Sequence, residues 1–200
     1  MQMGTHPTEN LQKTPQKRKR SSNREWKKLV AEFQKPHAGR ATWQLINTLV
    51  PLFAIWVSIY FLKDVSLWLC IPPAILGGLF MVRAFIIFHD CGHGSFLKSK
   101  RANSIIGFIT GTLTFTPYRQ WSWEHARHHA TNGDLDRRGI GDIWTLTVEE
   151  YVSSSRRLQL SYRFIRNPII LFVFAPIVLF VILQRFPNSK AKKKEKQSVY

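Results

Sequence analysis

Residues 83–96, RAFIIFHDCGHGSF, lead an apolar run directly into two histidines. His89 and His93 are four positions apart, so a helix that continues one turn beyond the apolar run places both imidazoles on one face. Gly92 and Gly94 favour the end of the helix at this point. The stretch therefore predicts an apolar helix with a pair of metal ligands at its end.

A second histidine group follows at residues 125–129, HARHH. His125 precedes His128 by three positions and His129 by four, so a single helical turn can project all three rings. The chain has seven histidines, and five of them fall in these two groups. A lone HxxxH more often marks two surface histidines, but five histidines grouped in this way favour a metal site. The remaining two lie in polar flanks and are interpreted as surface residues.

The identity of the metal stays open at this level, because neutral imidazole binds iron, copper and zinc alike. The HExxH pattern of zinc hydrolases is absent, since Asp90 follows the first histidine of its group. The two cysteines, Cys70 and Cys91, form no CxxC pair. This spacing excludes a disulfide scaffold and a zinc site built from cysteines. Metal-dependent hydrolysis is therefore disfavoured.

Uncharged segments on either side of Lys63 and Asp64 predict a membrane hairpin. Residues 41–62 contain no charged side chain, and a helix of that length, at about 1.5 Å per residue, crosses a bilayer core of about 30 Å. Residues 65–82 are also uncharged, and the two-residue link implies an antiparallel return. Arg83 lies close to the exit end, where we expect its long side chain to reach the headgroups.

Two further uncharged stretches follow along the chain. Residues 102–118 are rich in threonine and include two glycines, so we interpret them as a re-entrant or interfacial segment. Residues 167–184 are rich in Ile, Leu, Val and Phe and lie between two arginines, and we expect them to span. The predicted fold class is an all-α integral membrane protein, with about three transmembrane helices, the re-entrant or interfacial segment and a cytoplasmic helical region.

Charge divides the chain into a basic, largely disordered tail at 1–40, a membrane domain at 41–185 and a second basic tail at 186–200. The formal net charge is +17, from 29 Lys and Arg against 12 Asp and Glu. The first tail and residues 97–166 lie on one side if the first two helices form a hairpin, and the positive-inside rule makes that side cytoplasmic. A single crossing at 167–184 then puts the second tail on the opposite side, against the rule. This conflict implies either that something expected to follow is missing or that the last span does not fully cross.

The order of an apolar hairpin, HDCGHGSF, an apolar segment, TPYRQWSWEHARHHATNGDLDRRGIGDIWTLTVEEY and a further span resembles the membrane fatty acid desaturases. The resemblance is to the bacterial acyl-lipid type related to the plant omega-6 enzymes. It covers about residues 43–200, and the stretch from Pro117 to Tyr151 is specific rather than generic.

The resemblance implies an integral membrane oxygenase with two iron ions, held by histidines from the boxes HxxxH, HxxHH and a later HxxHH. The first two boxes are matched by His89, His93, His125, His128 and His129. With O2 as co-substrate, such an enzyme inserts a cis double bond into an acyl chain of a membrane lipid. The third box is absent from the sequence. The resemblance therefore also implies a truncated four-helix desaturase fold, whose last residues precede a fourth transmembrane helix.

Imidazoles that bind a metal commonly donate their second nitrogen to a carboxylate. Five acids near the two boxes are candidates for this role: Asp90, Glu124, Asp134, Asp136 and Asp142. Asp142 is preferred, because it lies in the family-like segment GDIWTLTVEEY. The alternative for each acid is a solvated charge that balances a nearby arginine. Trp121 and Trp123 are interpreted as residues of the membrane interface rather than as a lining of the acyl channel.

The sequence has no flavin, haem or iron–sulfur signature, so we expect electrons from a ferredoxin-like or other external donor. Basic side chains such as Arg119 and Arg127 would suit an acidic carrier, and equally anionic membrane lipid. We expect the cell inner membrane as the location, with the amino terminus and the histidine boxes cytoplasmic and no nucleic-acid partner. The alternatives are a histidine-rich hydroxylase or ketolase of the same superfamily, and a catalytically inert membrane remnant.

Overall fold

The computed structural model describes residues 26, 29–31, 35–139 and 143–200, and the chain from His37 to Tyr200 forms one compact unit. Every regular element among the described residues is a helix or a helical turn, which confirms the all-α prediction. Most of the tail predicted at 1–40 lies outside the described residues. Its last three residues are helical, because α2 begins at Ala38.

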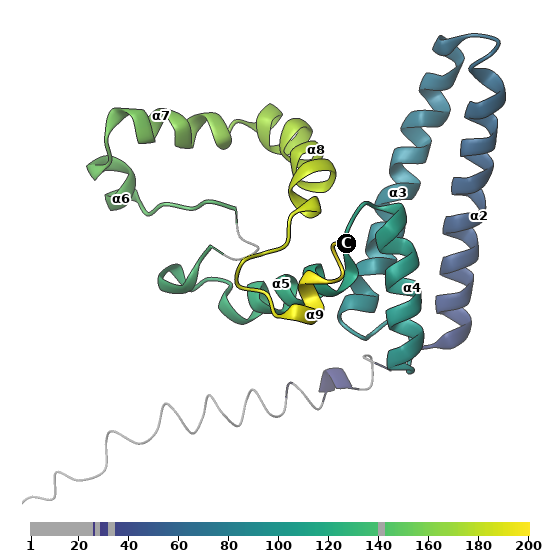
Figure 1. The fold of residues 1–200 in the computed structure, drawn as a ribbon, viewed down its shortest axis with the longest axis horizontal. Coiled ribbons are helices and arrows are strands. Elements are labelled where there is room, and N and C mark those ends of the chain that lie inside the picture. The colour runs from purple at the N-terminus through teal and green to yellow at the C-terminus, as the bar shows by residue number, and fades with distance from the viewer. Residues whose placement is uncertain (1–25, 27–28, 32–34, 140–142) are drawn as a thin grey trace, which may run out of the picture. The chain divides into compact units, whose positions relative to one another are not determined.

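Helices α2 (Ala38–Leu62) and α3 (Ile71–Gly92) pack side by side as an antiparallel hairpin (Figure 1). The side chain of His37 caps α2 by accepting a hydrogen bond from the backbone N–H of Arg40 at 3.3 Å. α2 continues through Pro51 without a break. Both helices are long and apolar enough to cross a membrane, so the two predicted spans are present in the structure.

The link between the legs of the hairpin is longer than the predicted two residues. Turn residues follow Leu62, and a tight turn of helix, η1 (Leu67–Cys70), precedes α3. Pro72 and Pro73 occupy the first turn of α3. Because proline lacks an N–H group, it is favoured in the first turn of a helix, where that group would have no partner within the helix. The two prolines therefore favour the start of α3 several residues beyond Asp64.

Arg83 was predicted to extend towards the headgroups, but its guanidinium contacts α2. Its Nη2 donates to Oδ1 of Asn47 at 2.8 Å, and its Nε donates to Oγ1 of Thr48 at 3.3 Å. Thr48 is fully buried between the helices. Within an apolar solvent, a polar group is more stable when a neighbouring helix supplies its hydrogen-bond partners. Arg83 thus joins the two legs of the hairpin.

Helices α4 (Lys100–Leu113) and α5 (Tyr118–Thr131) pack against α3. They are joined by a tight turn, in which the backbone N–H of Thr116 donates to the carbonyl of Gly111 at 2.7 Å. Phe115, in this turn, has a φ of 57°, the left-handed conformation that non-glycine residues seldom adopt. The segment interpreted as re-entrant or interfacial is therefore helix α4 and its turn, and its depth in a bilayer stays a prediction.

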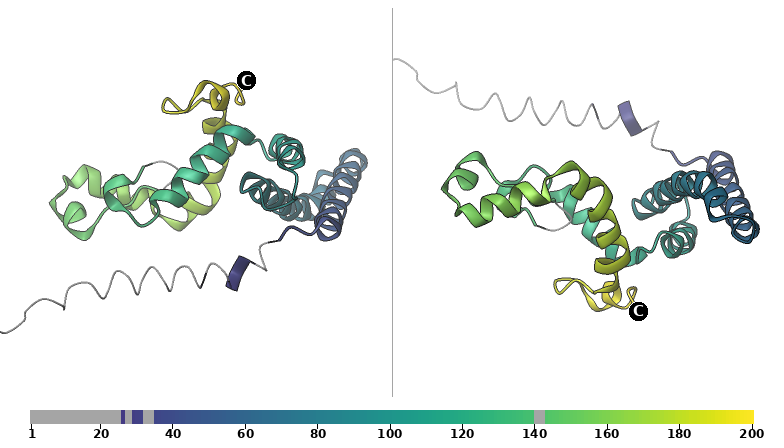
Figure 2. Two further views of the ribbon diagram at one scale, coloured as in Figure 1. Left: turned by 90° about the horizontal axis from the view of Figure 1, so that it is seen from below. Right: turned by 90° about the horizontal axis from the view of Figure 1, so that it is seen from above.

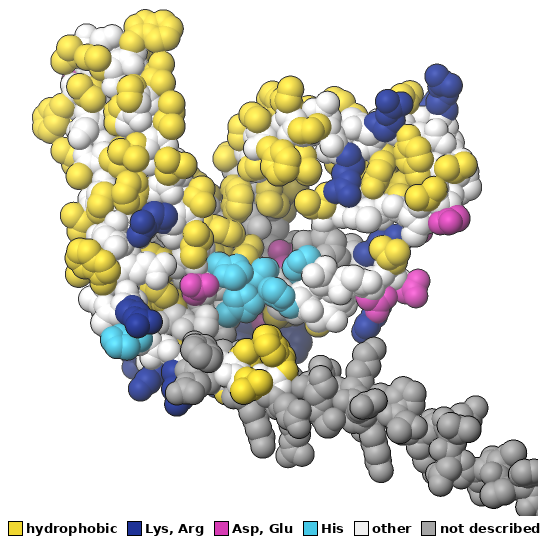
Figure 3. Space-filling model, turned by 180° about the vertical axis from the view of Figure 1, so that it is seen from behind, with side chains coloured by type: hydrophobic (Ala, Val, Ile, Leu, Met, Phe, Trp, Pro, Cys, Tyr) yellow, Lys and Arg dark blue, Asp and Glu magenta, His cyan; other side chains and the backbone are white. Residues whose placement is uncertain are grey.

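The interior of the unit is unusually polar, and its surface is unusually apolar. Among the residues that the structure describes, seven polar ones are buried: Thr48, Asn103, Thr110, Thr114, Thr116, Gln120 and Gln184. Hydrophobic side chains cover most of the visible surface of the hairpin (Figure 3). Buried polar groups together with an apolar surface are what a lipid solvent favours, because small and polar groups let helices pack closely there.

Shorter elements make up the second half of the chain. They are η2 (Leu135–Arg137), α6 (Val148–Ser153), α7 (Arg156–Ile165), η3 (Ile170–Phe174), α8 (Ala175–Ile177), η4 (Val178–Ile182), η5 (Leu183–Arg185) and α9 (Lys193–Lys196). The helical run from Ile170 to Arg185 is bent by 60° from α7, and the two together qualify as a third candidate span. The span expected at 167–184 therefore remains a prediction.

Residues 186–200, which form the carboxyl end of the chain, fold back onto α5 (Figure 2). Oε1 of Gln120 accepts a hydrogen bond from the backbone N–H of Asn188 at 2.9 Å, and the backbone N–H of Gln120 donates to Oγ of Ser198 at 3.1 Å. The second basic tail thus packs on α5. The side of a membrane on which it lies, and whether the preceding stretch fully crosses, stay predictions.

The close approach of α3, α4 and the α4–α5 turn predicts a difference between two glycines. A Cβ atom at Gly111 would lie 2.6 Å from the carbonyl oxygen of Thr116 and 2.9 Å from the ring of Phe88, whereas a Cβ at Gly78 meets nothing within 4 Å. We expect Gly111→Ala to lower the free energy of unfolding by about 1–3 kcal/mol through overpacking. Gly78→Ala should leave it unchanged or raise it by up to about 1 kcal/mol through helix propensity.

The measurement is thermal unfolding of the two variants and the wild type in detergent micelles, followed by circular dichroism. If Gly111→Ala unfolds at the same temperature as Gly78→Ala, the packing described here is wrong.

Candidate metal centre

The first histidine pair lies where α3 ends. His89 is in the last turn of α3, and His93 directly follows the last helical residue, Gly92. The backbone N–H of His93 donates to the carbonyl of His89 at 3.1 Å, so the helical spacing extends to this residue. Gly94 then has a φ of 70°, which ends the helix. The prediction that the helix continues to the histidines and stops at the glycines is confirmed.

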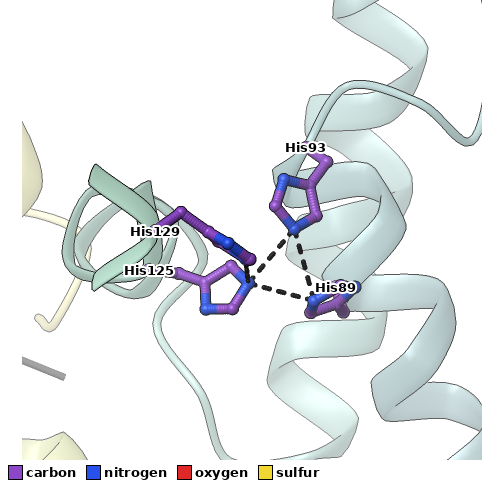
Figure 4. Close-up of side chains that lie close together, drawn as sticks. All are labelled: His89, His93, His125 and His129. Atoms are coloured by element: carbon purple, nitrogen blue, oxygen red, sulfur yellow. Dashed lines mark hydrogen bonds between the residues drawn. The ribbon is translucent and has the colours of Figure 1, made fainter. Parts of the chain in front are cut away.

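The second histidine group lies on α5, which approaches the end of α3. His125 and His129 are one turn apart, and both rings point towards His89 and His93 (Figure 4). Their side chains form one exposed patch on the surface (Figure 3). Helices that are separated by α4 in the sequence thus bring four imidazoles together, as the predicted convergence of the two groups requires.

The four rings meet through their Nε2 atoms. His89 is 3.3 Å from His93 and 3.0 Å from His125 between these atoms. The corresponding distances are 3.1 Å from His93 to His125 and 3.0 Å from His125 to His129. All four ligand atoms lie within 4.8 Å of one another.

These distances fit the coordination of one metal ion. Nitrogen ligands about 2.1 Å from an ion, at tetrahedral or octahedral angles, lie about 3.0–3.4 Å from each other. An imidazole binds a metal through a nitrogen that carries no proton. In the tautomer with unprotonated Nε2, the four rings would direct their lone pairs to a common centre.

Asp90 favours the tautomer of His89 that has its proton on Nδ1. Its Oδ1 lies 3.2 Å from Nδ1 of His89, so a proton on Nδ1 can be shared with the carboxylate. A proton on Nδ1 leaves Nε2 as the lone pair that faces the other histidines. Among the residues that the structure describes, Asp90 is thus the only one of the five predicted carboxylates that contacts a ring of the cluster.

The electrostatics of the cluster also favour neutral rings. Burial, and after it the charge repulsion of the neighbouring histidines, together lower the pKa of His125 to about 4. The pKa of His93 is lowered too, mainly by burial and then by His89. Both imidazoles are therefore unprotonated at neutral pH. Because protons and metal ions compete for the same lone pair, a low pKa favours metal binding.

His128 is oriented differently from the other four predicted ligands. Its ring centroid is 6.0 Å from that of His125 and 5.7 Å from that of His129, and it lies outside the group of four converging nitrogens. It lines a separate cavity of about 490 Å³ between the end of α5 and Arg166. The assignment of His128 as a metal ligand stays a prediction.

Two of the four remaining predicted carboxylates, Glu124 and Asp134, have partners outside the histidine cluster. Glu124 accepts a hydrogen bond from Nδ2 of Asn188 at 2.8 Å, and burial raises its pKa. Asp134 pairs with Arg137 at 2.6 Å, and this hydrogen bond lowers the pKa of the carboxyl group. Asp136 is exposed, and Asp142 lies outside the described residues. These four therefore stay predictions, and Asp134 fits the alternative role of balancing an arginine.

The contacts of Trp121 could not be predicted from the sequence. The indole stacks on the ring of His125, with centroids 4.3 Å apart and planes 17° apart. It also contacts Phe85 and Phe88 of α3 at 5.6 and 4.7 Å. Trp123, the other candidate for an interface residue, instead lies against the guanidinium of Arg127 at 5.2 Å. The one sequence signal for the stacking of Trp121 on His125 is their i, i+4 spacing.

An apolar cavity of about 380 Å³ lies beside the centre. It is lined by Met81, Val82, Phe85, Thr114, Phe115 and Phe180. Phe85 forms part of its wall and contacts Trp121, which in turn stacks on His125. Its volume is in the range of about 300–1,000 Å³ that is typical of ligand pockets. The cavity therefore offers space for an apolar group, and the side chains of Phe85 and Trp121 lie between it and His125.

The low pKa of His125 predicts its titration in the metal-free protein. We expect the imidazole of His125 to take up a proton with a midpoint of about 4. His89→Gln should raise that midpoint, because it removes the neighbouring histidine that most disfavours the charge on His125. The measurement is NMR of the protein labelled with ¹³C-histidine, with assignment by His125→Gln. A midpoint near 6.5, the ordinary value, would contradict the geometry of the cluster.

The family model described as "Fatty acid desaturase" matches residues 66–200. A protein of Bacillus subtilis (strain 168) named "Fatty acid desaturase" is 48% identical over 173 residues, which cover 86% of this chain and 49% of that protein. The "sn-1 oleoyl-lipid 12-desaturase" of Synechocystis sp. is 30% identical over 143 residues, which cover 71% of this chain and 39% of that protein.

The chain spans about half the length of the B. subtilis relative and less of the cyanobacterial one. No solved structure matches it. The family model covers well over half of the chain, including both histidine groups. The chain therefore belongs to the fatty acid desaturase family.

Proposed function

We propose that the protein is an acyl-lipid desaturase, which inserts a cis double bond into an acyl chain of a membrane lipid by means of histidine-bound iron and O2. The observation that carries this proposal is the convergence of the Nε2 atoms of His89, His93, His125 and His129 within 4.8 Å. Membership of the desaturase family supports iron over the other metals that imidazole binds.

Iron bound by these imidazoles would supply, with O2 as the oxidant, the power to remove hydrogen from an unactivated methylene, which no amino-acid side chain has. The residues of the chain hold the metal and position the substrate. Four nitrogens correspond to the ligands of one ion. In our proposal His128, which belongs to the same box as His125, contributes to a second ion together with the third box that the family resemblance implies.

The apolar cavity supports an acyl chain as the substrate. Its six lining residues are almost entirely apolar, and they come from α3, from the end of α4 and its turn, and from η4. A cavity of this kind at a lipid-covered surface is filled by hydrocarbon, because burying a polar group there without a partner is costly. Phe85 and Trp121 separate it from His125, so they would set how a methylene pair approaches the centre.

The names of relatives support the class of substrate and of electron donor. Two cyanobacterial relatives, from Synechocystis sp. and Nostoc sp., are named "sn-1 acyl-lipid omega-3 desaturase (ferredoxin)". We propose a ferredoxin-like donor for this chain too. Exposed arginines on and near α5, such as Arg119, offer positive charge to an acidic carrier.

We further propose that the protein lies in the cell inner membrane, with the amino terminus and both histidine groups on the cytoplasmic side. The support is the pair of helices that are long and apolar enough to cross a membrane, together with the excess of basic residues in the segments at one end of the hairpin.

The iron site predicts a loss of metal in single variants. We expect His93→Ala and His125→Ala to reduce the affinity for Fe²⁺ more than about tenfold, because each removes a ligand. His37→Asn is the matched control, since it leaves the converging cluster intact and retains a side chain that can cap α2. Anaerobic Fe²⁺ titration with measurement of bound iron gives both the affinity and the number of ions per chain.

The reaction predicts new double bonds in membrane lipid. We expect a host that expresses the protein and is fed saturated lipid to accumulate unsaturated acyl chains, whereas the His93→Ala variant yields none. Mass spectrometry of the extracted acyl chains checks this result. Hydroxylated chains in place of unsaturated ones would favour the hydroxylase alternative, and retained iron without any product would favour the inert alternative.

A further inference from the structure

Trp121 occupies a position between the apolar end of α3 and the metal centre. It is half-buried, one helical turn before His125 on α5, and the planes of the two rings are nearly parallel at 4.3 Å. The ring centroids of the same indole and of His89 are 5.7 Å apart, with an angle of 64° between the planes. One side chain thus contacts a histidine of each group.

The indole is itself held from the other side by α3. Phe88 contacts it at 4.7 Å and Phe85 at 5.6 Å between ring centroids. A Cβ atom at Gly92 would lie 3.1 Å from its Cζ3 atom, so the absence of a side chain at this position makes room for the ring. These contacts restrict Trp121 to one orientation, and the stacking passes that restriction on to His125.

The two histidines nearest the indole differ in how they are oriented. Nδ1 of His89 has the carboxylate of Asp90 at 3.2 Å. Among the residues that the structure describes, Nδ1 of His125 has no such partner, and its ring is instead covered by Trp121. The χ2 torsion of histidine has a broad energy profile, so an unsupported ring would sample many orientations. Stacking on a fixed indole removes this freedom at His125.

The strength of the stacking also depends on whether the ring of His125 is bound to a metal. An imidazole that donates its lone pair to a cation becomes electron-poor, and an indole attracts electron-poor rings and cations through its negative face. The contact is therefore stronger when His125 is bound to a metal than when it is free. An interaction that is stronger in the bound state raises the affinity for the metal.

We propose that Trp121 is a positioning residue that holds the imidazole of His125 in its metal-binding orientation and thereby raises the affinity of the histidine cluster for a divalent metal ion. This inference rests on the part of the proposed function that assigns a metal to the cluster.

The test is a titration of the full-length chain in detergent micelles with Co²⁺, whose visible absorption reports the number and geometry of its ligands. We expect Trp121→Leu to weaken Co²⁺ binding about 10- to 100-fold, the usual effect of removing a group that orients a ligand, and to alter the absorption spectrum. Trp121→Phe retains a ring that can stack, so its affinity should stay within a few-fold of the wild type.

The matched control is Trp123→Leu, on the same helix but in contact with Arg127 rather than with a histidine. It should bind Co²⁺ with wild-type affinity and spectrum. Circular dichroism and the unfolding temperature of each variant show whether it is folded. If Trp121→Leu does not fold, the fluorescence of Trp121→Phe decides: Co²⁺ quenches nearby indoles, so this variant should lose part of the quenching that the wild type and Trp123→Leu both show.

The outcomes separate the two proposals. A folded Trp121→Leu variant with wild-type affinity and spectrum overturns the positioning role and leaves the metal site intact. Unchanged quenching in Trp121→Phe overturns it as well. A wild-type chain that binds neither Co²⁺ nor Fe²⁺ overturns the proposed metal site itself, and the positioning role with it.

Discussion

A hydrogen bond from Tyr118 connects the first turn of α5 to the last turn of α3, and the geometry of the metal centre depends on this contact. Its hydroxyl donates to the carbonyl of Cys91 at 2.8 Å. Its ring packs against Gly107 so closely that a Cβ atom there would lie 2.2 Å from it. Because the contact fixes where α5 begins relative to the end of α3, His125 and His129, about two and three turns further along α5, face His89 and His93. The four nitrogens meet as a consequence.

The hairpin and the two histidine groups could be predicted because their signals are local. An uncharged run of sufficient length, glycines after His89, and the i, i+4 spacing of His125 and His129 each specify a short piece of helix. The contact of Asp90 with His89 also depends on adjacent residues. The family resemblance then joined these pieces into one site, and the structure places four of the five rings together.

The features that could not be predicted depend on pairs of residues far apart in the chain. The hydrogen bonds of Arg83 with α2, the packing of Trp121 on Phe85 and Phe88, and the contact of Asn188 with Glu124 have no local signature. The link after Leu62 was underestimated for a related reason: a count of uncharged residues locates apolar segments but not the turn at which a helix begins. Charge alone likewise could not place residues 186–200.

The bond between Arg83 and Asn47 bears on how the polypeptide enters its membrane. A lone guanidinium within an apolar helix is costly to transfer into hydrocarbon, at about 2.5–3.5 kcal/mol on insertion scales. The amide of Asn47 and the hydroxyl of Thr48 become available to it only when both legs lie side by side. To the extent that Arg83 enters hydrocarbon, insertion of the two legs as a pair would supply these partners, which insertion of α3 alone would not.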